Sequence, residues 1–216
     1  MINQYKHLIH STRHFENLNI QAGSDYRYQD ILSLESFELA NKEISSWDSY
    51  ESTPLHSLSD LARDNGVSLI AYKDESHRFS LKSFKALGGA YAVANLLLKK
   101  LKEQGIEAKS SDLIAGTYSE ITSKITVCCA TDGNHGRSVA WGAQKFGCNC
   151  VIYIHRTVSV VREEAIAKYG SIVNRIKGNY DESVHIAAEV AESNGYYVVS
   201  DTSYEGYTDI PKDVMQ

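Results

Sequence analysis

Three separate segments of the sequence place a reactive side chain where it could do chemistry. The first ends at Lys85, at the first turn of a mostly apolar stretch with helical spacing. A partly desolvated lysine amine is a nucleophile that can form a Schiff base with a carbonyl compound. The other interpretation is a solvated lysine whose stem lies along the helix, because surface lysines far outnumber catalytic ones.

The second segment is the hexapeptide Thr-Asp-Gly-Asn-His-Gly at residues 131–136. It lies between a predicted strand and a predicted helix, where backbone N–H groups converge and suit a carboxylate or a phosphate. A tight turn is the alternative explanation of its two glycines. The third segment, residues 200–207, follows the last predicted strand and carries the carboxylate of Asp201. By itself it would be interpreted as a solvated loop.

Hydrophobic spacing predicts that the three segments meet at one edge of a sheet. Short apolar runs predict strands at residues 67–72, 125–130, 151–154, 172–176 and 196–199. Apolar positions spaced by three and four predict helices at residues 57–64, 84–105, 138–146, 160–169 and 181–193. Residues 107–124 are polar and irregular, which is typical of a linker. The alternation predicts an α/β fold with a parallel sheet covered on both faces, and chemistry collects at the carboxyl ends of such strands.

Composition excludes several classes of protein. The chain has 216 residues, of which 43% are hydrophobic, so it can bury a real core. A net charge of −5 offers no basic face for a nucleic acid. The longest apolar runs are far shorter than the roughly 20 residues of a membrane helix. We therefore expect a soluble protein with neither nucleic acid nor membrane as a partner, and the N-terminal residues do not resemble a secretory signal.

The cysteines and histidines favour structural roles over a metal site. Buried thiols in a reducing cytoplasm are the expectation for all four cysteines: Cys128, Cys129, Cys148 and Cys150. Three histidines near the N-terminus have helical spacing: His7, His10 and His14. Because no carboxylate or cysteine accompanies them, a polar extension is favoured over a metal site, and no metal is expected.

The three segments together resemble a known enzyme family. Ser-Phe-Lys at residues 83–85, followed by Thr-x-Gly-Asn-His-Gly at residues 131–136, is similar to the fold-type II (tryptophan synthase β-like) pyridoxal-phosphate enzymes. Thr-Pro-Leu at residues 53–55 also matches that family. Within it, residues 72–79, 130–137 and 200–207 resemble the diaminopropionate ammonia-lyases. The resemblance extends from about residue 53 to the last residue.

The resemblance implies a role for each residue of the three segments. Lys85 would hold pyridoxal 5′-phosphate through a Schiff base, Phe84 would pack near the pyridine ring, and Asn134 would bond the 3-hydroxyl. Three further residues would help to hold the substrate carboxylate: Thr131, Gly133 and His135. The implied reaction is α,β-elimination of 2,3-diaminopropionate to ammonia and aminoacrylate, which hydrolyses to pyruvate and a second ammonia.

Asp132 separates this pattern from the amino-acid dehydratases of the same fold type, which usually carry a small neutral residue there. A carboxylate in a carboxylate-binding loop repels a simple amino acid, unless the substrate brings a second ammonium group or the carboxylate accepts the Cα proton. Asp201 adds a second negative charge. The resemblance implies that Asp132 is the base for one substrate enantiomer and Lys85 for the other. A threonine or serine dehydratase is the alternative within this fold type.

The resemblance also implies a division of the chain. Residues 1–52 would be an N-terminal extension, residues 53–124 the first part of the large domain, residues 125–205 a nearly complete small domain, and residues 206–216 the return to the large domain. In the family, the phosphate cup and the partner of the pyridine nitrogen lie in the second half, so we expect this large domain to be incomplete. Full-length relatives are expected to be homodimers. A complementing C-terminal half, or an inactive fragment with a binding or vestigial role, are the further expectations.

Overall fold

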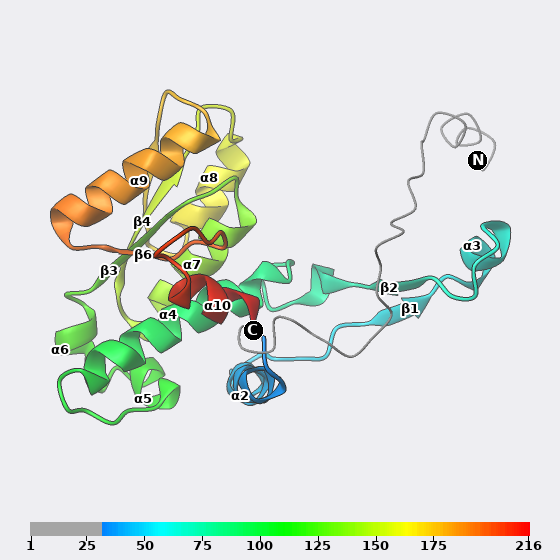
Figure 1. Cartoon of the computed structure of the whole chain (residues 1–216), viewed down its shortest axis with the longest axis horizontal. Helices are drawn as coiled ribbons and strands as arrows, with labels where there is room; N and C mark the ends of the chain where they lie inside the picture. The colour runs from blue at the N-terminus through cyan, green and yellow to red at the C-terminus, as the bar shows by residue number, and fades with distance from the viewer. Residues whose placement is uncertain (1–31) are drawn as a thin grey trace.

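In a computed structural model of the chain, which describes residues 32–216, a four-stranded parallel sheet forms the centre (Figure 1). The strands lie in the order β5-β4-β3-β6. Their bounds are Thr126–Ala130 for β3, Asn149–Ile154 for β4, Ile172–Arg175 for β5 and Tyr197–Val198 for β6. All three pairings are parallel. The predicted parallel α/β sheet is confirmed.

Helices cover both faces of this sheet. The helices are α7 (Asn134–Phe146), α8 (Val160–Ala167) and α9 (Tyr180–Asn194). Alternate residues of a strand point to opposite faces. Cys129 and Ile152 therefore join the core cluster that contains α7 and α8, whereas Cys128 and Val151 pack with α9. Figure 1 shows α9 on one side of the sheet and α7 and α8 on the other.

A second layer of helices packs against α7. Helix α4 (Lys85–Lys102) crosses α7 closely, and α10 (Asp209–Met215) and α2 (Leu34–Ser45) lie against α4. The contact with α7 depends on Gly142, because a Cβ there would lie 2.9 Å from the Ala90 Cα. The contact with α10 depends on Gly88, where a Cβ would overlap the Val214 backbone. Helix α4 is thereby held in a single position, and its first residue is Lys85.

The substitution Gly142→Ala is expected to destabilise the protein. Alanine favours a helix over glycine by up to about 1 kcal/mol, but the added methyl must push α4 away from α7, and overpacking costs about 1–3 kcal/mol. Urea unfolding should therefore show a lower free energy of unfolding. An increase would mean that helix propensity dominates and that α4 and α7 do not pack this closely.

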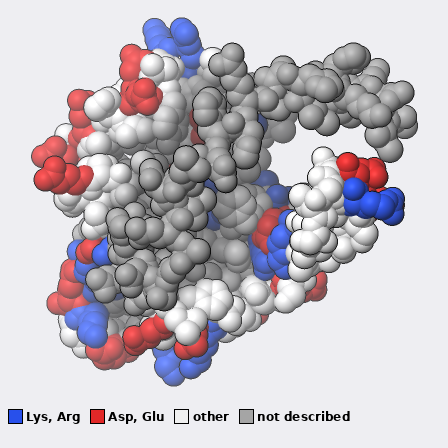
Figure 2. Space-filling model, turned by 45° about the vertical axis from the view of Figure 1, so that its right-hand side comes forward, with Lys and Arg blue, Asp and Glu red and all other residues white. Residues whose placement is uncertain are grey.

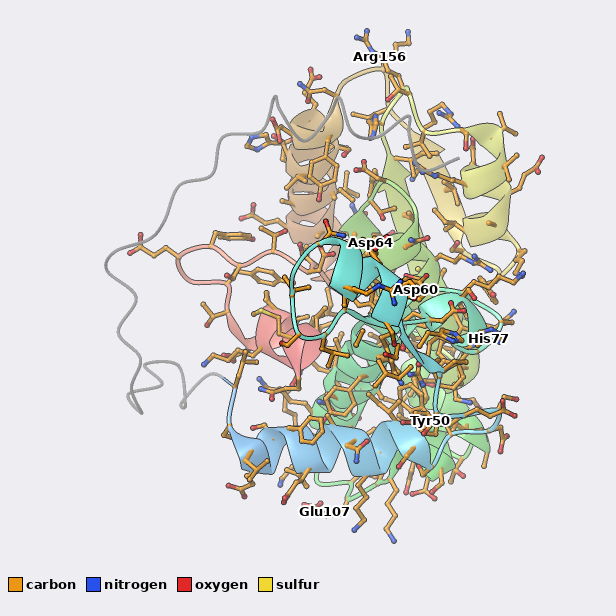
Figure 3. All side chains as sticks on the ribbon, turned by 90° about the vertical axis from the view of Figure 1, so that its right-hand side faces the viewer. Tyr50, Asp60, Asp64, His77, Glu107 and Arg156 are labelled. Carbon is orange, nitrogen blue, oxygen red and sulfur yellow. The ribbon has the colours of Figure 1, made fainter. Side chains whose placement is uncertain are left out.

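A β-ribbon projects from the body of the molecule (Figure 1). It contains β1 (Leu55–Ser57), α3 (Ser59–Asp64) and β2 (Ala71–Lys73), with β1 and β2 antiparallel. Asp60 and Asp64 lie on α3 at its end (Figure 3). The predicted buried strand at residues 67–72 is wrong, because β2 pairs only with β1 and every residue of both strands is exposed.

Buried polar contacts anchor the base of this ribbon. Arg78 is 5% exposed and donates to Glu75, to the Glu51 carbonyl and to the Thr53 hydroxyl, at 2.9, 2.9 and 3.2 Å. The hydrogen bond from Arg78 is the main reason that the pKa of Glu75 lies below its usual value, against the opposing effect of burial. Two of the motifs that carried the family resemblance, at residues 53–55 and 72–79, therefore meet in one structural network.

Two segments contain helices that the sequence analysis did not predict. The interval 107–124, predicted as a linker, contains α5 (Ser110–Ile114) and α6 (Ser119–Thr122), with Leu113 buried between them and the body. Within the predicted extension, α2 is capped by Ser33, whose hydroxyl accepts from the Ser36 N–H. The α2 residues Ala40 and Ile44 are buried.

The three histidines near the N-terminus, for which the sequence favours a polar extension over a metal site, lie outside the described residues. Among residues 32–216, no helix is both long and apolar enough to cross a membrane. On the face that Figure 2 shows, acidic and basic side chains are interspersed.

The buried-thiol prediction is confirmed for Cys128, Cys129 and Cys150, while Cys148 is only partly buried.

Candidate active site

The structure brings the three predicted segments together at the carboxyl edge of the sheet. Lys85 begins α4, His135 lies in the first turn of α7, and Asp201 follows β6. The Lys85 Nζ donates a hydrogen bond to Asp201 Oδ2. The His135 Nδ1 lies 3.8 Å from the same oxygen. Residues 116 positions apart in the sequence thus form one cluster.

The backbone before Lys85 is shaped by a turn and by hydrogen bonds from α7. Lys82 has φ 55°, in the left-handed region, which redirects the chain just before α4. Arg137 of α7 donates to the carbonyls of Leu81 and Ser80, at 3.1 and 3.0 Å. The Ser83 hydroxyl accepts from the Lys85 N–H at 3.3 Å. Because α7 holds this turn directly, Lys85 is positioned relative to the loop that begins α7.

The loop at residues 131–136 is closed by its own threonine. The buried Thr131 hydroxyl accepts from the N–H groups of Gly133 and Gly136, both at 3.0 Å. Gly133 has φ 153°, and a Cβ there would lie 3.3 Å from Arg162 Cδ, so this position requires glycine. Within residues 32–216 the N–H groups of Asn134 and His135 have no hydrogen-bond partner. The free donors for an anion are therefore those of Asn134 and His135, rather than that of Gly133.

His135 is the buried polar group of the cluster. Its Nε2 lies 2.8 Å from the Val199 carbonyl, so this nitrogen carries the proton in the hydrogen bond. Its Nδ1 is buried and has no hydrogen-bond partner among the described residues. Burial holds the pKa of His135 below its usual value, although Asp201 and the Val199 carbonyl oppose the shift. For Asp201, burial raises the pKa, but His135 and Lys85 outweigh it and leave the pKa below its usual value.

The lowered pKa of His135 predicts a stability change with pH. In the unfolded chain the His135 imidazole takes up a proton near pH 6.5, whereas in the folded protein it does so only at lower pH. The contribution of the neutral imidazole to the free energy of unfolding is therefore complete above pH 6.5 and is lost as the pH falls below that value. His135→Gln should flatten the decline between pH 6.5 and 5, by at most about 1.4 kcal/mol per pH unit. Urea unfolding at several pH values measures this. Equal slopes for both proteins would contradict the burial of a neutral imidazole.

Two adjoining cavities open from the cluster. One of about 350 Å³ is lined by residues of the three segments and by residues of α8 and α9. The other, of about 520 Å³, is more apolar, and Phe84, which is 62% exposed, contributes to it. Lys85, His135 and Asp201 line both. These volumes are in the range of small-molecule sites.

Three residues that the sequence analysis did not select lie at or beside the smaller cavity. His155 follows β4 and does not line the cavity itself, but its Nε2 lies 2.7 Å from Oδ1 of Asp132, which does. Arg162 of α8 donates to the Asp132 carbonyl at 3.4 Å. Tyr180 lines the same cavity, and burial, with added repulsion from Asp201 and Asp132, raises its pKa. His155 could have been found, because it directly follows a strand at the same sheet edge.

These donors and acceptors fit pyridoxal phosphate in part. The exposed Asn134 amide and the paired Lys85 amine both border the cavity, and the unpartnered His135 Nδ1 is a buried polar atom within it. Pyridoxal phosphate carries an aldehyde, a ring hydroxyl and an anionic phosphate. The lysine amine matches the aldehyde, and the asparagine amide matches the ring hydroxyl. The free N–H groups match an anionic group of the substrate. This set defines a class: α/β proteins that hold a small anionic carbonyl compound next to a lysine.

The comparison with known proteins narrows this class. The sequence profile of a family described as pyridoxal-phosphate dependent enzymes matches residues 47–212. The chain belongs to that family, whose cofactor is pyridoxal phosphate. Its fold is the fold-type II α/β fold.

Relatives extend this result. The diaminopropionate ammonia-lyase of Escherichia coli (strain K12) is 45% identical over 167 residues, which are 77% of this chain and 41% of that protein. A crystal structure of the Escherichia coli enzyme in apo form superposes with a TM-score of 0.77 at 40% identity, covering 86% of this chain and 49% of that chain. Threonine dehydratase 1 of Solanum lycopersicum is 28% identical over 172 residues, 79% of this chain and 23% of that protein. The chain spans less than half the length of these relatives.

Proposed function

We propose that this chain contributes the lysine-bearing half of an active site for pyridoxal-phosphate-dependent α,β-elimination of 2,3-diaminopropionate. The observation that carries the proposal is that Lys85, Asp132 and Asp201 line one 350 Å³ cavity. The balanced reaction converts diaminopropionate to ammonia and aminoacrylate, and water then converts aminoacrylate to pyruvate and a second ammonia. The 45% identical relative supports the choice of substrate.

Five residues of the chain would bind the cofactor, orient the lysine amine or accept the substrate proton. Bound pyridoxal phosphate supplies the electron sink that makes the Cα proton of the substrate acidic. Lys85 would hold it covalently, Phe84 would pack against its ring and Asn134 would donate to its 3-hydroxyl. Asp201, which already binds the Lys85 amine, would orient that amine. Asp132, which lines the same cavity, would accept the Cα proton of one substrate enantiomer.

The substrate carboxylate would be held at the N-terminus of α7. The free N–H groups of Asn134 and His135 point out of this helix end, where the helix dipole favours an anion. Thr131 and Gly133 would act by closing the loop, because the Thr131 hydroxyl already bonds the Gly133 N–H. This modifies the sequence-based expectation that Thr131 and Gly133 contact the carboxylate themselves.

A diamino acid matches the charge of this site. Asp132, which is 67% exposed, and Asp201 both line the smaller cavity, so two carboxylates border the space that a substrate would occupy. A second substrate ammonium group offsets their repulsion of the substrate carboxylate. The same charges disfavour serine and threonine, the substrates of the dehydratase alternative.

We further propose that the protein acts in the cytoplasm, on a small amino-acid substrate, with a homodimeric or complemented assembly supplying the rest of the site. Four free cysteines support a reducing compartment. The domain boundaries predicted above, at residues 52, 124 and 205, remain part of this proposal. A role as an inactive binding fragment is the competing proposal, and measured turnover decides between them.

The test is to combine the chain with a complementing C-terminal half, load the assembly with pyridoxal phosphate, and supply diaminopropionate, serine and threonine in parallel. Pyruvate from diaminopropionate, coupled to lactate dehydrogenase, is expected at a rate well above the rate of keto-acid release from serine or threonine. A faster reaction with threonine or serine would favour the dehydratase. Binding of the cofactor without turnover of any substrate would favour the inactive fragment.

A further inference from the structure

We propose that His155 is a positioning residue that orients the Asp132 carboxylate at the smaller cavity, in the Nε2–H tautomer that the carboxylate selects and the Thr157 hydroxyl accommodates. The inference rests on the proposed function, in which Asp132 accepts a proton from the substrate. It concerns a residue outside the three segments that the sequence analysis selected.

The geometry is a chain of two hydrogen bonds. The His155 Nε2 lies 2.7 Å from Asp132 Oδ1, and the His155 Nδ1 lies 2.9 Å from the Thr157 hydroxyl. An ionised carboxylate only accepts, so Nε2 must donate to Asp132. In the neutral imidazole Nδ1 then has a lone pair and accepts the Thr157 hydroxyl hydrogen. The Asp132 carboxylate therefore selects the Nε2–H tautomer, and the Thr157 hydroxyl is compatible with it because a hydroxyl can donate to Nδ1.

The imidazole is itself held in place. Arg175 donates from one nitrogen to the carbonyls of His155, Arg156 and Val158, at 3.4, 3.1 and 2.6 Å. Its other terminal nitrogen binds Glu163 of α8 at 2.5 Å. A single guanidinium thus fixes the whole turn that carries His155. Figure 3 shows Arg156, in the same turn, at one end of the molecule.

Packing restricts the imidazole ring further. The Tyr180 ring meets it edge-on, with centroids 6.4 Å apart, and the His155 side chain is only 16% exposed. Asp132, in contrast, is 67% exposed and would otherwise rotate freely. With Oδ1 engaged by His155, its second oxygen remains available for a substrate proton. A proton acceptor gains from such orientation, because a misplacement of about 1 Å can cost on the order of 100-fold in rate.

The first test reads the tautomer directly and needs no cofactor. Long-range ¹H–¹⁵N spectra of the labelled 216-residue protein should show the Nε2–H tautomer for His155. Asp132→Ala, which removes the acceptor, should produce a mixture of tautomers, whereas Thr157→Val should keep the Nε2–H tautomer because the carboxylate remains. Asp132 and Thr157 are both exposed, so both variants are expected to fold. A predominant Nδ1–H tautomer in the unaltered protein, or no effect of Asp132→Ala, would overturn the inference.

The second test uses turnover of the two diaminopropionate enantiomers by the pyridoxal-phosphate-loaded protein. His155→Leu should lower kcat about 10- to 100-fold for the enantiomer that uses Asp132, with KM little changed and the other enantiomer spared. His155→Gln keeps an N–H donor and should restore part of the rate. Equal losses for both enantiomers would show a merely structural role and overturn the inference. Absence of turnover by the unaltered protein would contradict the proposed function instead, and the tautomer spectra would still decide the role of His155.

Discussion

Replacement of Lys85 by arginine is expected to abolish diaminopropionate turnover and the visible absorbance of covalently held pyridoxal phosphate. Arginine keeps a positive charge for Asp201, but its guanidinium is not a nucleophile for the aldehyde. The variant also loses the amine that would exchange protons with the substrate. The rate should fall by more than about 10⁴-fold, the upper end of what one positioned acid or base contributes. Absorbance spectra and a pyruvate assay measure both effects.

Lys82→Arg is the matched control for this experiment. Lys82 lies three residues away in the turn before α4 and makes no bond to the cluster in the part of the chain that the structure describes. It should retain both the absorbance and most of the rate. If Lys85→Arg kept its absorbance band while Lys82→Arg lost it, the cofactor-holding lysine would be assigned to the wrong residue.

Replacement of Asp132 by asparagine should remove turnover of one diaminopropionate enantiomer and leave the cofactor absorbance intact. Asparagine has nearly the same shape and can still bond His155, but it cannot accept the Cα proton. The loss should be about 10²- to 10⁴-fold, the range for a general base. Steady-state rates with each pure enantiomer measure this loss.

Asp64→Asn provides the comparison for the Asp132 variant. Asp64 lies on α3, which Figure 1 shows at the outer end of the projecting ribbon, away from the sheet. The substitution Asp64→Asn removes one carboxylate from the chain and changes no residue that lines the cavity, so both enantiomers should react at the rate of the unaltered protein. Unchanged turnover of both enantiomers by Asp132→Asn would mean that Asp132 contributes charge alone, and would move the chain toward a general dehydratase.

The central sheet could be predicted because its signals are local. Apolar runs of strand length alternate with helical spacing from residue 125 to 199, and each helix ends at a glycine or a polar turn. Gly147 and Gly195, for example, adopt the left-handed conformation directly after α7 and α9. The ribbon strands could not be predicted as exposed, because an apolar run of six residues looks the same whether it joins a sheet or leaves the body.

Helix α2 illustrates a signal that was present but weak. Ala40, Ile44 and Trp47 are spaced by four and three and are all buried, and Trp47 packs edge-on against Phe146 with centroids 5.6 Å apart. Exposed Leu34 and Leu39 interrupt this stripe in the sequence. Only the tertiary partner in α7 reveals which of the apolar residues face the core.

For the site, the sequence could predict which segments converge, but not which hydrogen bonds their side chains make. The sheet-edge rule brings His135 and Asp201 together, as the structure shows, whereas Lys85 reaches them from the start of α4 and not from the end of a strand of the sheet. The sequence could not reveal that the Thr131 hydroxyl bonds to the N–H of Gly133 within the loop, because this bond depends on the φ of Gly133. Nor did it reveal His155, since a histidine after a strand has many ordinary structural uses.

Borohydride trapping on the unaltered protein is the most direct test of the central claim, that Lys85 is the residue that holds the cofactor. The chain, combined with a complementing C-terminal half, is mixed with less than one equivalent of pyridoxal phosphate, reduced with borohydride, digested and analysed by peptide mass spectrometry. The label is expected on the peptide that contains Lys85, and it should disappear in Lys85→Arg. A label concentrated on Lys73 or Lys82, or spread evenly over surface lysines, would contradict the claim.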